Sequence, residues 1–282
     1  MHKKVKVLAE DGVQISALLF SPQNRSKGVI LFCPGLGIPK EFYLNYCEFL
    51  RSSDYRVLVF DYRGIGKDDL REKTSKINLT NWPLQDIPAC INYILREFPS
   101  EKIYYVGHSV AGQIAGLVPS IESIERFLFF CSTGGHYRLF EFPLNLFTFF
   151  MFYVHIPIVS TLFGQLPKGL TYRGVAISKG VAKDWAMFSR HPLYFRGFVK
   201  SRFEKDLYEK ITQKIDWISF SDDPIATSKA LKFMMGHYKN APISHHQIDP
   251  KSLSLSRIGH SGFFNKKKGR KLWEWSLGIL NS

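Results

Sequence analysis

The stretch YYVGHSVAG, residues 104–112, continues an apolar run that begins at Ile103 and sets Ser109 between small residues. A strand that turns sharply into a helix at a small-x-Ser-x-small sequence lifts the serine oxygen out of the sheet, where a base can reach it. The small side chains of Gly107 and Ala111 allow the strand and helix to pass closely. The stretch therefore predicts a strand, a tight turn and a helix, with Ser109 as a nucleophile. The alternative is a serine that only caps the helix.

On either side of this stretch, strand and helix patterns alternate. Residues 29–32, 57–60 and 103–106 are almost continuously apolar, as strands covered on both faces must be. Residues 41–51 and 84–98 have helical patterns and are long enough for the crossovers that parallel strands require. These segments predict an α/β fold around a central parallel sheet.

The N-terminal segment has a different pattern. Residues 5–9 and 13–20 flank the turn signal Asp11-Gly12, which predicts an antiparallel hairpin. The remaining expected elements are strands at 127–131, 216–220 and 242–248 and helices at 227–238 and 267–280.

Between the strands at 127–131 and 216–220 the alternation stops for about 80 residues, far longer than a plain crossover. We expect residues 134–205 to form a mostly helical cap over the sheet, and residues 1–133 and 206–282 to form the core domain. The cap contains residues 144–164, which carry no charge other than a protonated His155 and approach the length that crosses a bilayer. Pro157 and several polar residues favour instead a cap helix that lines an apolar pocket and contacts a membrane surface peripherally. A transmembrane helix is the alternative.

Two further residue types complete a catalytic triad in the chain order that such a nucleophile requires. The sequence SDDPIA follows the strand at 216–220, and the carboxyl ends of parallel strands are where active sites gather. Asp223 is the predicted acid and Asp222 the alternative. His260, in a glycine-flanked loop before the last helix, is the predicted general base.

An ester-cleaving site also needs donors for the negative oxygen of the tetrahedral intermediate. The backbone N–H of Val110 lies at the positive end of the helix after Ser109. A second N–H is expected from Leu36, because Gly35 and Gly37 permit a tight turn after the strand at 29–32. The predicted oxyanion hole is therefore formed by Leu36 and Val110.

Composition excludes several classes of protein. The 282 residues are 45% hydrophobic and 22% charged, too apolar for a disordered chain. The formal net charge is +14, yet the cations are scattered and no groove-reading motif accompanies the run at 266–271, so nucleic acid is not an expected partner. The four cysteines lack metal-site or disulfide spacing, and no secretory leader is evident, so we expect a cytoplasmic protein with no metal and no cofactor.

Together these motifs resemble the α/β-hydrolase superfamily. They are PGLG at 34–37, FDYRGIG at 60–66, GHSVAG at 107–112, SDDP at 221–224 and IGHSGFF at 258–264. The sequence looks closest to a bacterial branch of predicted hydrolases that is similar to the monoglyceride lipase and serine aminopeptidase groups. The resemblance implies a mostly parallel eight-stranded sheet with a helical cap after the sixth strand, and a triad of Ser109, Asp223 and His260. It also implies that Asp61 and Arg63 brace the loops around the site and that Gly64 and Gly66 allow tight turns.

The leading functional hypothesis is a serine hydrolase that cleaves a carboxylic ester or thioester with a lipophilic acyl group, a small-molecule substrate. Phenylalanines are concentrated in the cap, and we name Phe147, Phe150 and His108 as candidate substrate contacts. The phenylalanine rings could equally form a core between cap and sheet. The alternatives are a peptidase or amidase and a non-catalytic lipid-binding or membrane-associated member of the fold. The cap acids available to a peptidase are Glu141, Asp184, Glu204 and Asp206.

Overall fold

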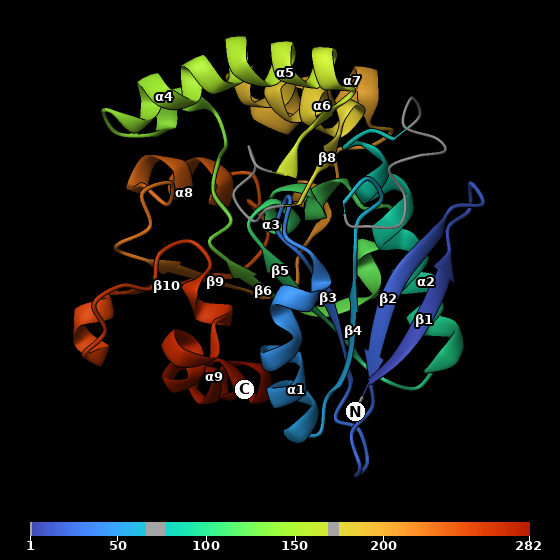
Figure 1. Ribbon diagram of the computed structural model, residues 1–282. Helices are drawn as coiled ribbons and strands as arrows, with labels where there is room; N and C mark the ends of the chain where they lie inside the picture. The colour runs from blue at the N-terminus through green and yellow to red at the C-terminus, as the bar shows by residue number, and fades with distance from the viewer. Residues whose placement is uncertain (1, 66–76, 169–174) are drawn as a thin grey trace.

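The computed structural model describes residues 2–65, 77–168 and 175–282, and within them eight strands form one twisted sheet (Figure 1). The strand order is β1-β2-β4-β3-β5-β6-β9-β10. The strands are β1 (His2–Leu8), β2 (Gln14–Phe20), β3 (Val29–Cys33), β4 (Arg56–Phe60), β5 (Ile103–His108), β6 (Ile124–Phe130), β9 (Ile215–Phe220) and β10 (Ile243–Ile248). The predicted α/β-hydrolase fold class is confirmed.

Strand directions follow the sequence patterns. The β1–β2 hairpin is antiparallel, with Val5 opposite Ala17, and β2 also runs antiparallel to β4. All other neighbours are parallel, from β4–β3 through β5 and β6 to β9–β10. Parallel strands bring their carboxyl ends to one edge of the sheet, and the active-site residues predicted from the sequence lie in the segments that follow these ends.

Helices cover both faces of the sheet because successive residues of a strand point to opposite sides. Ile30 and Phe32 of β3 belong to the core shared with α1 (Leu44–Ser52) and α9 (Lys266–Asn281), whereas Val29 and Leu31 face the opposite core. That second core includes residues of α2 (Ile87–Glu97), α3 (Val110–Ile114) and α8 (Ser228–Met235). Shorter helices in the connections are η1 (Lys40–Tyr43), η3 (Trp82–Asp86), η4 (Ala115–Leu117), η5 (Ile121–Ser123), η10 (Tyr208–Lys210), η11 (Pro250–Leu253) and η12 (Gly262–Phe264).

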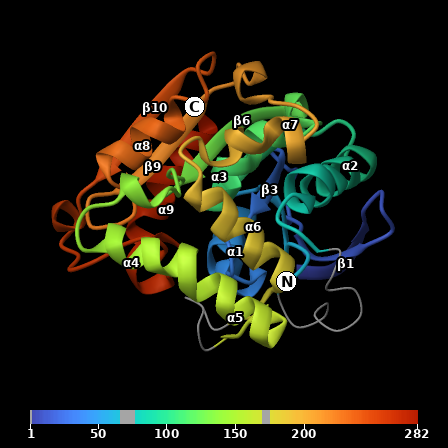
Figure 2. The same cartoon turned by 90° about the horizontal axis from the view of Figure 1, so that it is seen from above.

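The chain between β6 and β9 folds over the carboxyl edge of the sheet, and we call residues 134–168 and 175–205 the cap (Figures 1 and 2). Its elements are η6 (Tyr137–Leu139), α4 (Leu144–Phe150), η7 (Met151–His155), α5 (Ile156–Phe163), α6 (Lys179–Arg190), η9 (Tyr194–Phe198) and α7 (Val199–Arg202). A two-stranded sheet of β7 (Gln165–Leu166) and β8 (Ile177–Ser178), which the sequence did not predict, lies beside them. The expected cap boundaries, at 133/134 and 205/206, fall in the connections after β6 and after α7.

Helices α4 and α5 continue into one another through η7 as a helix of 20 residues, Leu144–Phe163. It is long and apolar enough to cross a membrane, with a mean hydropathy of 1.8, but only 17% of that window is buried in the protein. One stripe along the helix faces inward, because Phe152, Ile156 and Ser160 are buried. We call the exposed remainder the outer face of α4–α5.

The half-buried His237, outside the site, makes the stability of the fold depend on pH. Burial, and then the charge of Arg196, lower the pKa of His237 from 6.5 to about 4. As pH falls, His237 binds a proton in the unfolded chain before it does so in the folded protein. The fold therefore loses stability between pH 6.5, the ordinary pKa, and the lower pKa of the folded protein. We expect Tm to be lower at pH 5 than at pH 7.5, and His237→Gln to reduce that difference by about 3 °C, equivalent to about 1 kcal/mol. Calorimetry of both proteins at both pH values checks this, and an unchanged difference in the variant would contradict it.

Candidate active site

The turn after β5 gives Ser109 the strained backbone that the sequence pattern predicts. Ser109 has φ 54° and ψ −112°, and its N–H donates to the carbonyl of Phe130 on the neighbouring strand at 2.8 Å. The helix after the turn passes very close to β6. A Cβ on Gly112 would lie 2.3 Å from Ser132 Oγ and 2.7 Å from Ser132 Cβ, so only glycine fits there. This close packing holds the backbone of Ser109 in its uncommon positive-φ conformation.

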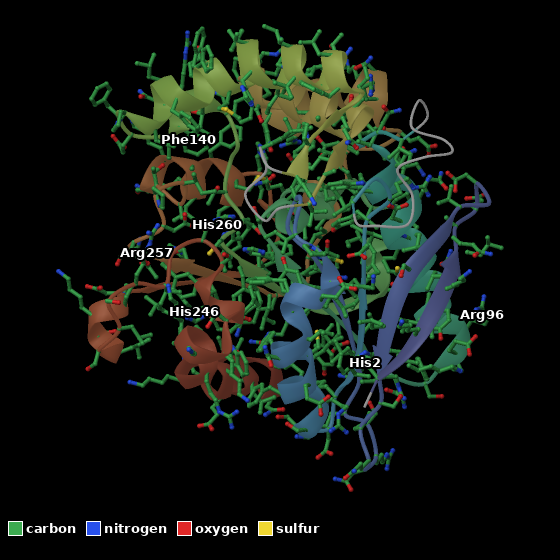
Figure 3. The ribbon with its side chains drawn as sticks, viewed as in Figure 1. His2, Arg96, Phe140, His246, Arg257 and His260 are labelled. Atoms are coloured by element: carbon green, nitrogen blue, oxygen red, sulfur yellow. The ribbon has the colours of Figure 1, made fainter. Side chains whose placement is uncertain are left out.

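Three side chains from distant segments meet at this turn. His260 Nε2 lies 2.9 Å from Ser109 Oγ, and His260 Nδ1 lies 2.7 Å from Asp223 Oδ2. A carboxylate only accepts hydrogen bonds, so Nδ1 carries the proton and Nε2 is free to accept from the serine hydroxyl. Figure 3 places His260 at the carboxyl edge of the sheet, beneath the cap. The structure thus brings together the three residues that the sequence nominated.

The two neighbouring aspartates make different contacts. Asp222 accepts the backbone N–H of Ile258 at 2.9 Å and that of Gly259 at 3.0 Å. These bonds hold the loop that carries His260, whereas the Asp223 carboxylate contacts the imidazole itself. The geometry therefore favours Asp223 over Asp222 as the partner of His260.

The surroundings of Asp223 keep it ionised. Burial by itself would raise the pKa of this carboxyl, but the charge of His260, together with hydrogen bonds from His260, the N–H of Ile225 and the Cys131 thiol, outweighs burial, and the pKa lies below its ordinary value. Burial, and then the charge of Asp223, raise the pKa of the Cys131 thiol far above its usual range. Cys131, Asp223 and His260 are the group of possible metal ligands within the described residues, but a protonated thiol is a poor ligand and the other two engage each other.

A hydrogen-bond chain links three loops behind the site. His108 Nε2 lies 2.8 Å from the carbonyl oxygen of His260, which can only accept, so Nε2 is protonated. His108 Nδ1 then accepts from the Tyr43 hydroxyl at 2.8 Å, and the Tyr43 oxygen accepts the N–H of Gly35 at 2.9 Å. A Cβ on Gly35 would lie 2.8 Å from His108 Nδ1, so glycine is required for this approach. The chain positions the histidine loop and the loop after β3 relative to Ser109.

Both predicted oxyanion donors border the site. Ile38 N–H closes a turn onto Gly35 O at 3.1 Å, and Gly37 within it has φ 69°, which suits glycine. That closing bond does not use the N–H of Leu36. The N–H of Val110 begins α3, and the first amides of a helix have no acceptor within it. Leu36 and Val110 line the same cavity as Ser109.

A cavity of about 310 Å³ opens from Ser109 towards the cap. Its walls are mostly apolar with a few polar groups at one end, where Gln113 donates to Thr133 O at 2.6 Å and accepts from the Tyr194 hydroxyl at 3.0 Å. The lining consists of Leu36, Ile38, Ser109, Val110, Gln113, Thr133, Gly135, Phe140, Thr148, Phe152, Trp185, Tyr194, Asp223, Pro224, Ile225, Arg257 and His260.

The predicted substrate contacts need correction. Phe147 and Phe150 lie on the outer face of α4–α5, 59% and 52% exposed, and do not line this cavity. His108 is fully buried and is used by Tyr43 and the His260 carbonyl. The cap helix contributes Thr148 and Phe152 instead, because a helix turns by one whole turn in about four residues and only one stripe can face inward.

Sequence reasoning also missed the polar end and the mouth of the cavity. Gln113, Tyr194 and Arg257 come from three distant segments, and none lies in a motif. The spacing of Thr148, Phe152, Ile156 and Ser160, four residues apart, is the signal that could have located the inner face of the cap helix.

Residues of FDYRGIG brace the surrounding loops as the resemblance implies. Asp61 accepts the N–H of Lys40 at 2.7 Å and pairs with its ammonium group. Arg63 pairs with Asp86 at 2.5 Å and with Asp11. Gly64 has φ 77°, whereas Gly66 lies outside the described residues.

Comparison with known proteins agrees with this architecture. The sequence pattern of the family described as alpha/beta hydrolase fold matches residues 28–124. Monoacylglycerol lipase ABHD2 of Danio rerio is 29% identical over 112 residues, which are 38% of this chain and 26% of that protein. The matched segment therefore spans about a quarter of the curated relative.

Solved structures resemble nearly the whole chain. An esterase from Exiguobacterium antarcticum superposes with a TM-score of 0.63 at 14% identity, over 99% of this chain and 100% of that one. A soluble variant of the monoglyceride lipase of Saccharomyces cerevisiae, in complex with a substrate analog, gives a TM-score of 0.66 at 13% identity, over 100% and 94%. At such identities the likeness concerns the fold. Taken with the family match over residues 28–124 and the sheet order, it shows that this chain has the α/β-hydrolase fold.

Proposed function

We propose that the protein is a serine hydrolase that cleaves a carboxylic ester or thioester, with a lipophilic acyl group, through an acyl-enzyme on Ser109. The observation that carries the proposal is the imidazole of His260, within hydrogen-bond distance of both Ser109 Oγ and Asp223 Oδ2. A nucleophile, a base and an acid that orients the base are the parts that acyl transfer needs.

In the first half-reaction, His260 Nε2 takes the hydroxyl proton as Ser109 Oγ bonds to the acyl carbon. The carbonyl oxygen becomes an anion facing the N–H groups of Leu36 and Val110, a contribution of roughly 3 kcal/mol per donor in comparable sites. The bond to the leaving alcohol or thiol then breaks, and the imidazolium returns the proton to that group. Asp223, kept ionised, stabilises the imidazolium meanwhile.

In the second half-reaction, water replaces the leaving group. His260 takes a proton from the water, whose oxygen bonds to the acyl carbon, and the same two N–H groups face the new oxyanion. The bond from the acyl carbon to Ser109 breaks, His260 returns the proton to Oγ, and the carboxylic acid leaves. No group outside the chain is needed to balance either step.

The relatives support this class of reaction. The Danio rerio relative is named a monoacylglycerol lipase, and the two structures described above are an esterase and a monoglyceride lipase. The largely apolar wall beneath the cap, including Phe140, Phe152 and Trp185, suits an acyl chain.

A peptidase would need an acid near the site for a substrate amine. Within the described part of the chain, Asp223 is the one acid that lines the cavity, and it faces His260. Of the cap acids, Asp184 pairs with Arg202 at 2.8 Å. Asp206, just beyond the cap, pairs with Arg196. These pairings support an ester substrate over a peptide.

Covalent labelling tests the proposal. We expect a fluorophosphonate to react with the native protein and leave one adduct, which peptide mass spectrometry locates on Ser109. Unfolded protein is the control, because the reactivity depends on the assembled triad. An adduct on another serine, or no reaction beyond that of unfolded protein, would contradict a serine hydrolase and favour the non-catalytic alternative.

Chain length provides a separate prediction. A cavity of about 310 Å³ has room for roughly ten groups of water size, near the lower end of ligand sites. We therefore expect kcat/KM for p-nitrophenyl esters to peak at acyl chains of about four to eight carbons. The measurement is a series from acetate to palmitate in detergent-free buffer. Rates that rise continuously to palmitate would show that the acyl group occupies a different surface.

The cytoplasmic location belongs to the same proposal. It is supported by the four cysteines, which are all buried and unpaired in the structure.

A further inference from the structure

The outer face of α4–α5 is an unusually large apolar surface for a protein in water. The exposed side chains include Leu162 at 74% and Leu146 at 63%, and the full set is Leu146, Phe147, Phe149, Phe150, Tyr153, Val154, Ile158, Leu162 and Phe163. Phe142, just before the helix, is also exposed. Contiguous apolar patches of this kind mark sites of association with a partner or a membrane. At 1.5 Å per residue the helix is about 30 Å long.

The orientation of this helix favours a position along a membrane surface. It forms the top of the cap, farthest from the sheet (Figure 1). Its inner stripe of Phe152, Ile156 and Ser160 is buried against the rest of the molecule. A helix that crossed a bilayer would have to expose this stripe, including a serine, to lipid. A helix with one face packed and the other apolar instead lies in the interface plane.

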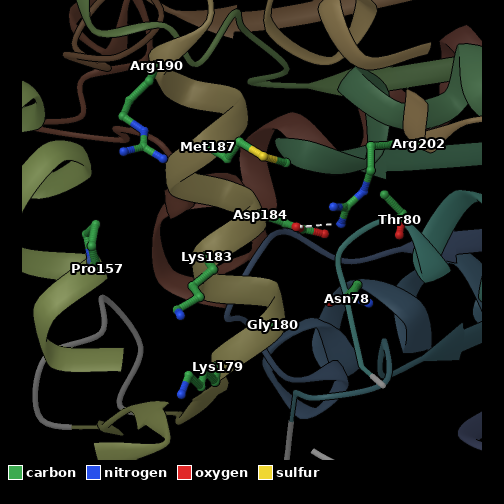
Figure 4. A pocket seen from close by; sticks show the side chains of 10 residues that line it. All are labelled: Asn78, Thr80, Pro157, Lys179, Gly180, Lys183, Asp184, Met187, Arg190 and Arg202. Carbon is green, nitrogen blue, oxygen red and sulfur yellow. Dashed lines mark hydrogen bonds and ion pairs between the residues drawn. The ribbon is translucent and has the colours of Figure 1, made fainter. Parts of the chain in front are cut away.

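A basic groove of about 830 Å³ adjoins this face and runs along α6, from Pro157 of α5 on one side to Asn78, Thr80 and Arg202 on the other. Figure 4 shows Lys179, Lys183 and Arg190 on the side of α6 that faces Pro157 of α5. The guanidinium of Arg190 also lies 5.5 Å from the ring centroid of Tyr153, on the apolar helix. The groove and the outer face of α4–α5 are therefore continuous.

Acids of the described residues do not balance the charges in the groove. Asp184 is the acid that lines it, and it pairs with Arg202 at 2.8 Å on the other side of α6. No ion pair to Lys179, Lys183 or Arg190 occurs among residues 2–65, 77–168 and 175–282. Residues 134–205 contain ten Lys and Arg against three Asp and Glu, a net charge of +7, half of the total for the chain. The cap thus has an apolar face bordered by cations that form no ion pair with any described acid.

We propose that the groove binds the phosphate headgroup of an anionic phospholipid while the outer face of α4–α5 lies among the acyl chains of the same leaflet. An anionic membrane surface is the partner that complements both features at once, because it presents negative phosphates beside hydrocarbon. The inference deepens the proposed function, and rests on it for one consequence: docking brings the cavity under the cap close to lipophilic esters in the bilayer.

Vesicle flotation tests the proposal directly. We expect the protein to float with vesicles in which about one third of the phosphatidylcholine is replaced by phosphatidylglycerol, and to bind pure phosphatidylcholine much more weakly. Raising salt from about 0.1 M to 0.5 M should weaken the first interaction. Equal binding to both kinds of vesicle, or no binding to either, would overturn the proposal.

Variants locate the contact. Lys179→Gln with Lys183→Gln should weaken binding to the anionic vesicles roughly 30-fold, since each basic residue near such a surface contributes a factor of about five. The matched control is Lys266→Gln with Lys267→Gln, which removes the same charge from α9, on the far side of the sheet (Figure 1). A similar loss in the control pair would show that net charge, not the groove, drives binding. Leu146→Ser with Leu162→Ser should weaken binding to both kinds of vesicle.

Two further experiments distinguish a lipid headgroup from free phosphate, and failure of docking from failure of hydrolysis. Inorganic phosphate at millimolar concentration should not displace the protein at constant ionic strength; displacement would identify free phosphate as the ligand and overturn the lipid proposal. Ser109→Ala should bind vesicles like the native protein, so failure of hydrolysis and failure of docking are distinguishable. Thermal unfolding of each variant shows whether it is folded, and substitutions of these surface lysines and leucines are expected to leave Tm unchanged.

Discussion

Replacing Ser109 by alanine is expected to lower kcat for a p-nitrophenyl ester by about 10⁴-fold or more. The alanine leaves His260 and Asp223 in place but removes the hydroxyl oxygen that lies 2.9 Å from His260 Nε2 and would attack the ester. The residual rate should come from water acting with the oxyanion donors. Steady-state kinetics at matched enzyme concentration measures the effect.

Ser132→Ala is the matched control for this change. Ser132 is fully buried, lies beside Gly112 and does not line the cavity. We expect its activity to stay within a few-fold of the native enzyme, because its hydroxyl takes no part in the chemistry. If Ser109→Ala kept more than about 1% of the native rate, another group would have to be the nucleophile.

Substitution of the two adjacent aspartates should separate catalysis from loop support. Asp223→Asn is expected to lower kcat about 10⁴-fold, because an amide can donate to His260 Nδ1 and favours the tautomer that cannot accept the serine proton. The fold should remain, since the shape of the side chain is unchanged. Steady-state kinetics, with circular dichroism as the check on folding, measures this.

Asp222→Asn should behave differently, since Asp222 holds the backbone of Ile258 and Gly259. The new amide presents an N–H to one of these donors, so we expect roughly a tenfold loss of kcat and a Tm lower by about 2–4 °C. If Asp222→Asn lowered kcat more than Asp223→Asn did, Asp222 would be the catalytic acid.

Asp223 also sets an acid limit on stability. The pKa of Asp223 is lower in the folded protein than in the unfolded chain, so the ionised carboxylate stabilises the fold at pH values above its unfolded pKa. This stabilisation is lost as pH falls through the pKa of the folded protein. Asp223→Asn should therefore remove part of the acid dependence of Tm below about pH 4.

Much of the active site could be predicted from short patterns. Ser109 was located because its neighbours must be small for a strand and helix to pass, and a Cβ at Gly112 would indeed collide with Ser132. His260 and Asp223 were located because parallel strands deliver their following loops to one edge. Local sequence left Asp222 as an alternative to Asp223, because the two share the same turn and differ in their contacts to a loop about 37 residues away.

The cavity lining was far less accessible to prediction. Gln113, Tyr194 and Arg257 are ordinary residues in their local sequence and become site residues only through long-range packing. His108, named as a candidate substrate contact, points away from the cavity, because alternation along β5 directs it to Tyr43 and the His260 carbonyl.

The sequence by itself determined the order of strands and helices, the sharp turn at Ser109 and the nomination of three catalytic side chains, because each depends on neighbours in the chain. Only the tertiary structure decided which side of the helix Leu144–Phe163 faces the site. Periodicity reveals a buried face through the contrast between apolar and polar positions. In a helix that is apolar almost all round, that contrast is nearly absent, so Phe147 and Phe150 could be assigned to the solvent side, and Thr148 and Phe152 to the cavity, only once the cap was packed on the sheet.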